Sequence, residues 1–200
     1  MEPNPLRYYV IRGSGATTSE HGRVAWSTGD LFVVPKTDGP LAHACDGAEA
    51  HGGAALYWIH DQPLLDYLGV APSVSRFNAA LFTRTRLLET VEEIRHGPGH
   101  EHVNRLGVLL GNAATEKTTK TLTHVMWSLL NSIGPRTVQK PHRHNSVALD
   151  LAVSAPWPPG KVYTLMGREL DAHGNIIDPI RCDWADGSVF VTPSARRVAN

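Results

Sequence analysis

Two histidines one residue apart, His142 and His144, stand in the stretch PHRHNSVALDL at residues 141–151. In a β-strand, successive side chains point to opposite faces, so residues two apart point to the same side. Neutral imidazole nitrogens are common ligands of divalent metal ions. The spacing therefore predicts that His142 and His144 are two ligands of one metal ion. The alternative is a pair of structural histidines at the entrance of a strand.

Catalytic metal sites usually have three protein ligands, and the sequence offers two further candidates. Asp150 lies six residues after His144 and shares its face in a regular strand, although a solvent-facing or capping aspartate is the favoured interpretation. His124 precedes the pair, and its favoured interpretation is a wall histidine bonded to the backbone. Because two imidazoles alone hold a divalent ion weakly, we expect substoichiometric metal.

Composition limits the partners of this chain. Nineteen basic residues balance nineteen acidic ones in 200 residues, and no basic run carries interleaved aromatic residues, which argues against nucleic acid as a partner. The N-terminal residues lack the pattern of a signal peptide, and no apolar run is long enough to span a bilayer. We therefore expect a cytoplasmic globular protein with no membrane partner.

Other residues of metal-binding type are interpreted as structural. Cys45 and Cys182 lie far apart without CxxC spacing, so two buried thiols are expected rather than a disulfide framework or a zinc ribbon. His96, His100 and His102 gather in RHGPGHEH around the predicted end of a helix, where they are expected to face solvent.

Two distant stretches share one pattern: WSTGDLFVVP at residues 26–35 and WADGSVFVTP at residues 184–193. In each, the glycine is expected to allow a tight turn into a strand, and the proline ends that strand because it lacks an N–H group. The chain therefore contains one structural unit twice. Only 34 residues precede Pro35, whereas His142 stands 51 residues before Pro193, so the first unit has no room for its own histidine pair. Either that unit never had one, or the chain begins inside it.

Further strands and two helices are predicted from periodicity. KVYTLMGREL and NIIDPIRCDW are strand-like runs joined by the hairpin signal DAHG, and TKTLTHVMWSLL alternates as a strand with Thr121, Thr123, Val125 and Trp127 on one face. DQPLLDYLG predicts a helix with Asp61 as its N-cap residue. RLLETVEEIRHGPG predicts a second helix, with one apolar face formed by Leu87, Leu88, Val91 and Ile94.

These elements predict a mainly β protein, because many short strands with Gly and Pro turns are typical of a sandwich or a barrel. We expect three regions. Residues 1–60 form the second half of a first barrel, residues 61–115 form a helical connector, and residues 116–200 form a second barrel that lacks its closing strands.

The stretches PHRHNSVALDL and GSVFVTP together resemble the two motifs of the cupin superfamily, in which a His-x-His pair is followed by Gly-x5-Pro and another histidine. The repeated arrangement is similar to bicupins of the gentisate 1,2-dioxygenase and 1-hydroxy-2-naphthoate dioxygenase type. This resemblance implies cupin jelly-roll barrels, one partial and one nearly complete, around a divalent metal. Ferrous iron is the usual ion of the dioxygenases, with manganese, nickel and zinc as alternatives.

The sequence departs from the family pattern at defined positions. Val198 stands where the second motif has its histidine, and Ala195 where it has a glycine. His43 is the corresponding candidate in the first repeat, although the favoured interpretation is a loop histidine, because its His-x-His partners are missing. Ala148 and Leu149 occupy the positions in which many cupins carry a glutamate ligand. The resemblance also implies that three residues lie on barrel walls, and we expect them to belong to the core: Tyr163, Met166 and Trp127.

Two hypotheses follow. The first is an iron-dependent oxidoreductase that resembles ring-cleaving dioxygenases of hydroxy-aromatic acids, with His142 and His144 as ligands of an incomplete site. The alternative is a non-catalytic cupin-type binding or structural module. Since an incomplete barrel leaves strand edges unpaired, association of two copies through open edges is also expected.

Overall fold

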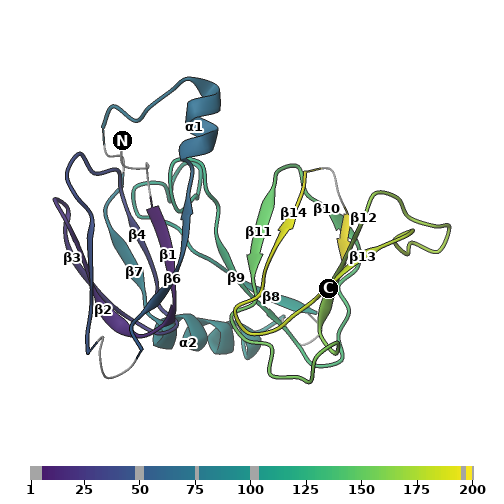
Figure 1. The fold of residues 1–200 in the computed structure, drawn as a ribbon. Coiled ribbons are helices and arrows are strands. Elements are labelled where there is room, and N and C mark those ends of the chain that lie inside the picture. The colour runs from purple at the N-terminus through teal and green to yellow at the C-terminus, as the bar shows by residue number, and fades with distance from the viewer. Residues whose placement is uncertain (1–5, 48–51, 75–76, 100–103, 195–196, 200) are drawn as a thin grey trace. The chain divides into compact units, whose positions relative to one another are not determined.

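The computed structural model describes residues 6–47, 52–74, 77–99, 104–194 and 197–199 (Figure 1). The chain divides into two compact units, residues 1–132 and residues 133–200. Most of the regular structure is β-strand, which confirms the predicted fold class. Within the described ranges, neither helix combines the length and the apolar character needed to cross a lipid bilayer.

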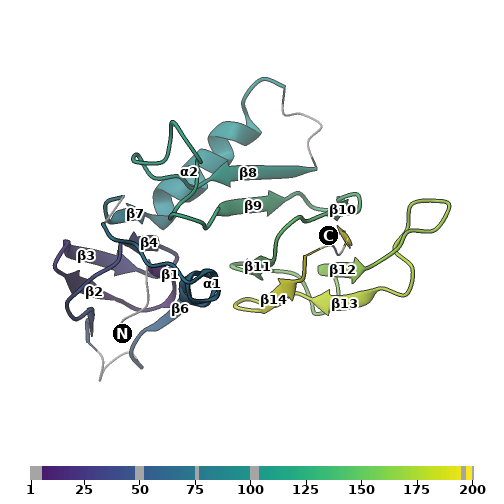
Figure 2. The same ribbon diagram turned by 90° about the horizontal axis from the view of Figure 1, so that it is seen from above.

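Among the described residues, the first unit contains three sheets. One has the strand order β6–β1–β4–β7, and these strands are Ala55–His60, Leu6–Arg12, Leu31–Val34 and Ala80–Phe82. Another has the order β3–β2–β5, with strands Gly22–Ser27, Ser14–Ser19 and Ala42–Cys45. The third pairs β8 with β9, Arg105–Leu109 and Leu129–Ile133, and Figure 2 shows α2 beside β8.

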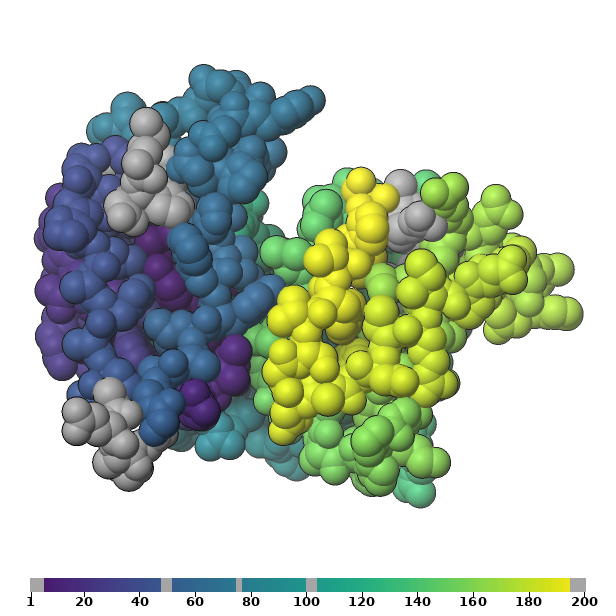
Figure 3. All heavy atoms as spheres, viewed as in Figure 1, coloured from purple at the N-terminus to yellow at the C-terminus, as the bar shows by residue number. Residues whose placement is uncertain are grey.

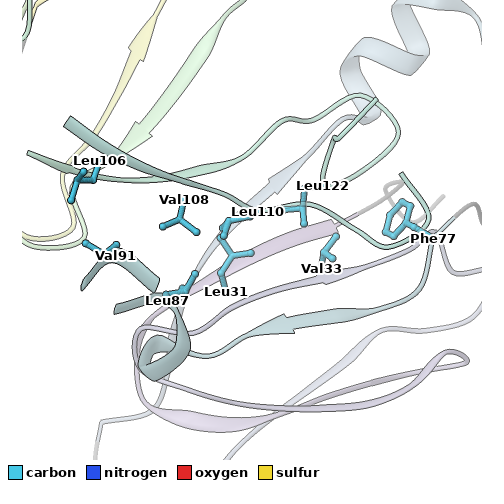
Figure 4. Close-up of a cluster of buried hydrophobic side chains, with 9 residues drawn as sticks. All are labelled: Leu31, Val33, Phe77, Leu87, Val91, Leu106, Val108, Leu110 and Leu122. Atoms are coloured by element: carbon cyan, nitrogen blue, oxygen red, sulfur yellow. The ribbon is translucent and has the colours of Figure 1, made fainter. Parts of the chain in front are cut away.

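Strand β4 is buried on both faces and separates two hydrophobic clusters. Phe32 and Val34 point into one cluster, whose other members are Leu6, Tyr8, Val10 and Trp26. Leu31 and Val33 point into the other, which Figure 4 shows together with side chains from α2, β8 and the loops: Phe77, Leu87, Val91, Leu106, Val108, Leu110 and Leu122. A strand that is covered on both faces has apolar residues in succession, and residues 31–34 have this pattern.

Both predicted helices are present, as α1 (Gln62–Leu68) and α2 (Arg84–Arg95). Helix α1 ends at Gly69 in the left-handed conformation, and α2 begins at Thr83, whose hydroxyl accepts a hydrogen bond from the Arg86 N–H. Leu87 and Val91 of α2 are buried as predicted. Leu88 is 48% exposed, so its assignment to the buried face was wrong.

The predicted strand at residues 119–130 is absent along most of its length. The amides of Leu122 and Thr123 both donate to the Met126 carbonyl, and the Met126 N–H donates to the Thr123 hydroxyl at 3.0 Å. This turn places Thr123 in the interior and leaves Trp127 59% exposed, and a strand begins only at β9. A threonine that bonds its neighbouring backbone competes with strand pairing, and here it prevails over the alternation of the sequence.

The second unit contains two antiparallel sheets. The larger has the order β10–β15–β12–β13, with strands His142–Arg143, Arg197–Ala199, Tyr163–Gly167 and Ile180–Asp183. The smaller pairs β11 (Ala148–Leu151) with β14 (Val189–Thr192). The predicted hairpin between β12 and β13 is present, and its turn is held by hydrogen bonds to the carboxylate of Asp171.

The internal repeat is visible in side-chain contacts at equivalent positions. Trp26 donates its indole N–H to the Thr17 hydroxyl at 2.9 Å, and Trp184 donates its own to the Thr164 hydroxyl at 2.9 Å. Both threonines are almost completely buried, at 1% exposure each. A buried indole N–H needs an acceptor, and both units supply one from a threonine on an earlier strand, β2 for Trp26 and β12 for Trp184.

The turns that enter β4 and β14 also match. Gly29 donates its N–H to the Val10 carbonyl, and Gly187 donates to the Ala152 carbonyl, each at 2.8 Å. Both glycines have positive φ, 89° and 82°, where a side chain would be strained. The glycines of the repeated motif therefore allow the tight turns that the sequence predicts.

Candidate metal centre

His142 and His144 converge on each other in the second unit. Their Nε2 atoms lie 3.1 Å apart and their ring centroids 4.9 Å apart, and both residues are half-buried. The prediction that the two rings lie on one side of the chain is confirmed. Strand β10, which contains His142, pairs with β15, so the site lies at one edge of the larger sheet.

The distance between the two Nε2 atoms fits a shared ion. Two nitrogen ligands bound at about 2.1 Å lie about 3.0 Å apart in octahedral directions and about 3.4 Å apart in tetrahedral directions. In the absence of an ion, a contact at 3.1 Å requires a proton on one of the two nitrogens. The two imidazoles therefore have the chemistry and the spacing of neighbouring metal ligands.

Strands β15 and β12 follow β10 in the larger sheet. Val198 is the register partner of His142 on β15, and Met166 is the register partner of Val198 on β12. Met166 is 7% exposed and accepts a hydrogen bond from the Thr192 hydroxyl through its sulfur, at 3.5 Å. Its predicted position in the core is confirmed.

A third ligand is not grouped with the pair. Across the described ranges, no set of three His, Cys, Asp or Glu side chains is arranged to hold a metal ion. Asp150 lies on β11 opposite Phe190, whose ring is 6.2 Å from that of Trp184. His124 belongs to the first unit, where its ring packs edge-on against Phe77 at 5.3 Å.

The His43 side chain contacts residues in the first copy of the repeat. Its Nδ1 lies 2.7 Å from the Thr17 hydroxyl, which also accepts the indole N–H of Trp26, and its ring packs edge-on against Tyr8. Loss of hydration lowers the pKa of His43, so its ring is neutral at pH 7. His43 lies within β5, so its interpretation as a loop histidine was wrong.

The remaining candidates have structural surroundings. His96 is exposed at the end of α2, 3.5 Å from Glu92, whereas His100 and His102 lie outside the described residues. Tyr163 lies under the guanidinium of Arg181, with 3.8 Å between the guanidinium carbon and the ring centroid. The exposure of Trp127 overturns its predicted place in the core.

The cysteines differ from expectation in one respect. Cys45 and Cys182 are free thiols, as predicted, but both are half-buried rather than buried. Cys45 lies on β5, and Cys182 lies on β13, within the run that the sequence predicted as a strand.

Asp61, which the sequence predicted only as an N-cap residue, is a buried acid. It is 4% exposed, and neither carboxylate oxygen has a hydrogen-bond partner in the part of the chain that the structure describes. It occupies the predicted N-cap position of α1, but its side chain makes no capping bond. Burial raises the pKa of Asp61 from 3.8 to about 6. The sequence predicted that α1 begins at Asp61, but it did not predict that the Asp61 side chain is buried.

Comparison with known proteins supports the fold. No family model matches the chain, and no curated protein sequence matches it. Salicylate 1,2-dioxygenase from Pseudaminobacter salicylatoxidans matches with a TM-score of 0.66 at 11% identity, over 98% of this chain and 62% of that chain. A variant of the same enzyme matches with a TM-score of 0.67 at 12% identity, over 98% of this chain and 61% of that chain.

A second similar structure is a variant of Bacillus subtilis oxalate decarboxylase. Its TM-score is 0.51 at 15% identity, over 99% of this chain and 59% of that chain. The chain therefore spans about three fifths of the length of the solved structures that it matches. These proteins share the cupin fold, and the likeness shows that this chain has the cupin fold as well.

Proposed function

We propose that this chain binds a divalent metal ion through the Nε2 atoms of His142 and His144 and performs the chemistry of a ring-cleaving dioxygenase on hydroxy-aromatic acids. The observation that carries the proposal is the 3.1 Å separation of the two Nε2 atoms. The similarity in fold to salicylate 1,2-dioxygenase supports the reaction class.

The role of the two histidines is to hold the ion and to leave other positions open. Neutral imidazoles donate one lone pair each, so two of them occupy only one side of a four- or six-coordinate ion. Ferrous iron, when bound, supplies a Lewis-acidic and redox-active centre for the aromatic acid and O2. Met166 is buried on β12, the strand that pairs with β15 on the side away from β10.

Two protein ligands imply modest affinity. Catalytic sites usually use three protein ligands, so a two-histidine site releases its ion more readily on dialysis. We therefore expect the purified chain to contain less than one equivalent of metal. Oxygen chemistry then depends on the supply of Fe²⁺ to the solution.

Oxygen consumption tests the function. With salicylate or gentisate and added Fe²⁺ under reducing conditions, the chain is expected to consume O2 slowly, and the rate is expected to fall to the buffer background in the His142→Ala/His144→Ala variant. His173→Ala is the matched control, since His173 is an exposed histidine of the same unit, on the β12–β13 hairpin. An oxygen electrode measures the consumption of O2, and chromatography measures the loss of the aromatic acid.

Equal oxygen uptake in the double variant would contradict the proposal, because the reaction would then not depend on the pair. Metal bound by His142 and His144 without any oxygen uptake would instead favour the non-catalytic binding module.

A further inference from the structure

Arg7 is a half-buried cation in the middle of a sheet of the first unit. It lies on β1, where its register partners are Val33 of β4 on one side and Ile59 of β6 on the other. Val33 is fully buried and Ile59 is 7% exposed, so the Arg7 side chain leaves the sheet between two apolar side chains. In Figure 3, little of this N-terminal strand, in dark purple, is visible between the segments of the same unit that follow it.

Within the described ranges, the guanidinium of Arg7 makes one hydrogen bond. Its Nη1 donates to the Ser128 hydroxyl at 2.9 Å, and Ser128 is 5% exposed. A guanidinium carries five N–H groups, and those on Nε and Nη2 form a planar fork. This fork donates to no described residue. Ser128 therefore fixes one corner of the guanidinium and leaves the fork available.

Arg7 has no counter-ion among the described acidic residues. None of the ion pairs in the described ranges includes Arg7. Burial lowers the pKa of Arg7, Tyr57 partly opposes this effect, and no carboxylate contributes to it. A charge that is removed from water normally has a partner of opposite charge, because its lost hydration must be replaced. The described residues of the first unit leave the charge of Arg7 without such a partner.

Asp61 does not neutralise Arg7, although it follows Ile59 by two residues at the end of β6. Neither oxygen of the Asp61 carboxyl group has a hydrogen-bond partner in the described ranges. A guanidinium beside a carboxyl group lowers the pKa of that group, whereas burial raises the pKa of Asp61 to about 6. The two charged side chains are therefore separate.

We propose that Arg7, positioned by Ser128, binds a small organic carboxylate in the first unit, with Nε and Nη2 donating to the two carboxylate oxygens. Two parallel N–H groups match the two oxygens of a carboxylate. One negative charge balances the single charge of Arg7, whereas a phosphate dianion would leave excess charge beside Val33 and Ile59. Both protein residues of this site belong to residues 1–132, so the proposal does not depend on the metal centre of the second unit.

Titration of the full chain with acetate tests this site, and sodium chloride at the same ionic strength is the reference. In NMR spectra of the wild-type chain, acetate is expected to shift the side-chain Nε–H signal of Arg7 saturably, with half-saturation at about 10 mM or below. Chloride is expected to leave this signal in place. The signal is assigned from its correlation with the backbone signals of β1.

Variants separate the fork from the charge. Arg7→Lys keeps the charge and removes the fork, so half-saturation by acetate, measured from the rise of the thermal unfolding midpoint, is expected to increase about 10-fold or more. Arg23→Lys is the matched control at an exposed position on β3 of the same unit, and it is expected to behave like the wild type. Ser128→Ala is expected to weaken acetate binding about 10-fold, and Ser128→Thr, which keeps the hydroxyl, is expected to restore it.

Two results would overturn the proposal. One is an Arg7 signal that acetate, up to about 100 mM, shifts no more than chloride does. The other is an unchanged half-saturation in Arg7→Lys. If Arg7→Lys does not fold, the titration of the wild-type chain decides the question alone, because it observes the Arg7 Nε–H group directly. Unchanged acetate binding in Ser128→Ala would contradict the positioning role of Ser128.

Discussion

Replacing Val198 with histidine is expected to raise the affinity of the second unit for Zn²⁺ about 100-fold or more. Val198 is the register partner of His142, and directly opposite residues on paired strands carry their Cβ atoms on one face, about 5 Å apart. A third imidazole at this position completes the three-ligand set that catalytic zinc and iron sites use. The substitution also restores the histidine of the motif that the sequence resembles.

The neighbouring position supplies the matched control. Arg197 is the register partner of Arg143 and follows the opposite side of the strand alternation. Arg197→His therefore adds the same side chain to the same strand on the wrong face, and no gain in affinity is expected. Titration against a chromophoric chelator measures both variants. An equal gain from Arg197→His would show that any added histidine binds zinc and would contradict the assigned geometry.

Replacing Asp61 with asparagine is expected to raise the free energy of unfolding at pH 7 by about 2 kcal/mol, since a raised carboxyl pKa corresponds to a charge that the fold disfavours. Both oxygens of Asp61 are buried without a described partner, and asparagine keeps the volume and the N-cap preference. Asp66→Asn, at an exposed position of the same helix, is the control and is expected to change stability by less than about 0.5 kcal/mol.

The pH dependence of this effect has a definite sign. The pKa of Asp61 is about 6 in the folded chain and 3.8 as its ordinary value, so the folded state binds the proton more tightly. The destabilisation is fully present above pH 6 and disappears as the pH falls toward 3.8. The difference between wild type and Asp61→Asn, measured by chemical denaturation, is therefore expected to shrink from pH 7 to pH 4. A difference that stays constant or grows over this range would rule out Asp61 as the cause.

The features that could be predicted from the sequence depend on local geometry. The convergence of His142 and His144 was predicted from the two-residue period of a strand, and it is present although β10 ends at Arg143. The repeat needed only a glycine at a tight turn, and Gly29 and Gly187 both adopt positive φ. The end of α1 likewise follows from the left-handed preference of Gly69.

The features that escaped prediction depend on what packs against a segment. The alternation around Thr123 matched a strand, yet its hydroxyl holds a turn with Met126 instead. Asp61 carried a clear helix-start signal, but its burial depends on surrounding elements that periodicity does not describe. Leu88 fitted the apolar face of α2, and the neighbouring elements bury only part of that face. Tertiary packing decided the burial of Asp61 and the exposure of Leu88, whereas local hydrogen bonds decided the turn at Thr123.

The central claim is that His142 and His144 bind one metal ion together, and X-ray absorption spectroscopy of the tag-free, Zn²⁺-loaded chain tests it most directly. We predict about one ion per chain at saturating zinc, with two imidazole nitrogens at about 2.0–2.1 Å in its first coordination shell. Both the ion and these nitrogens are expected to be lost in His142→Ala/His144→Ala and retained in His173→Ala. The same zinc content and the same imidazole shell in the double variant would contradict the claim.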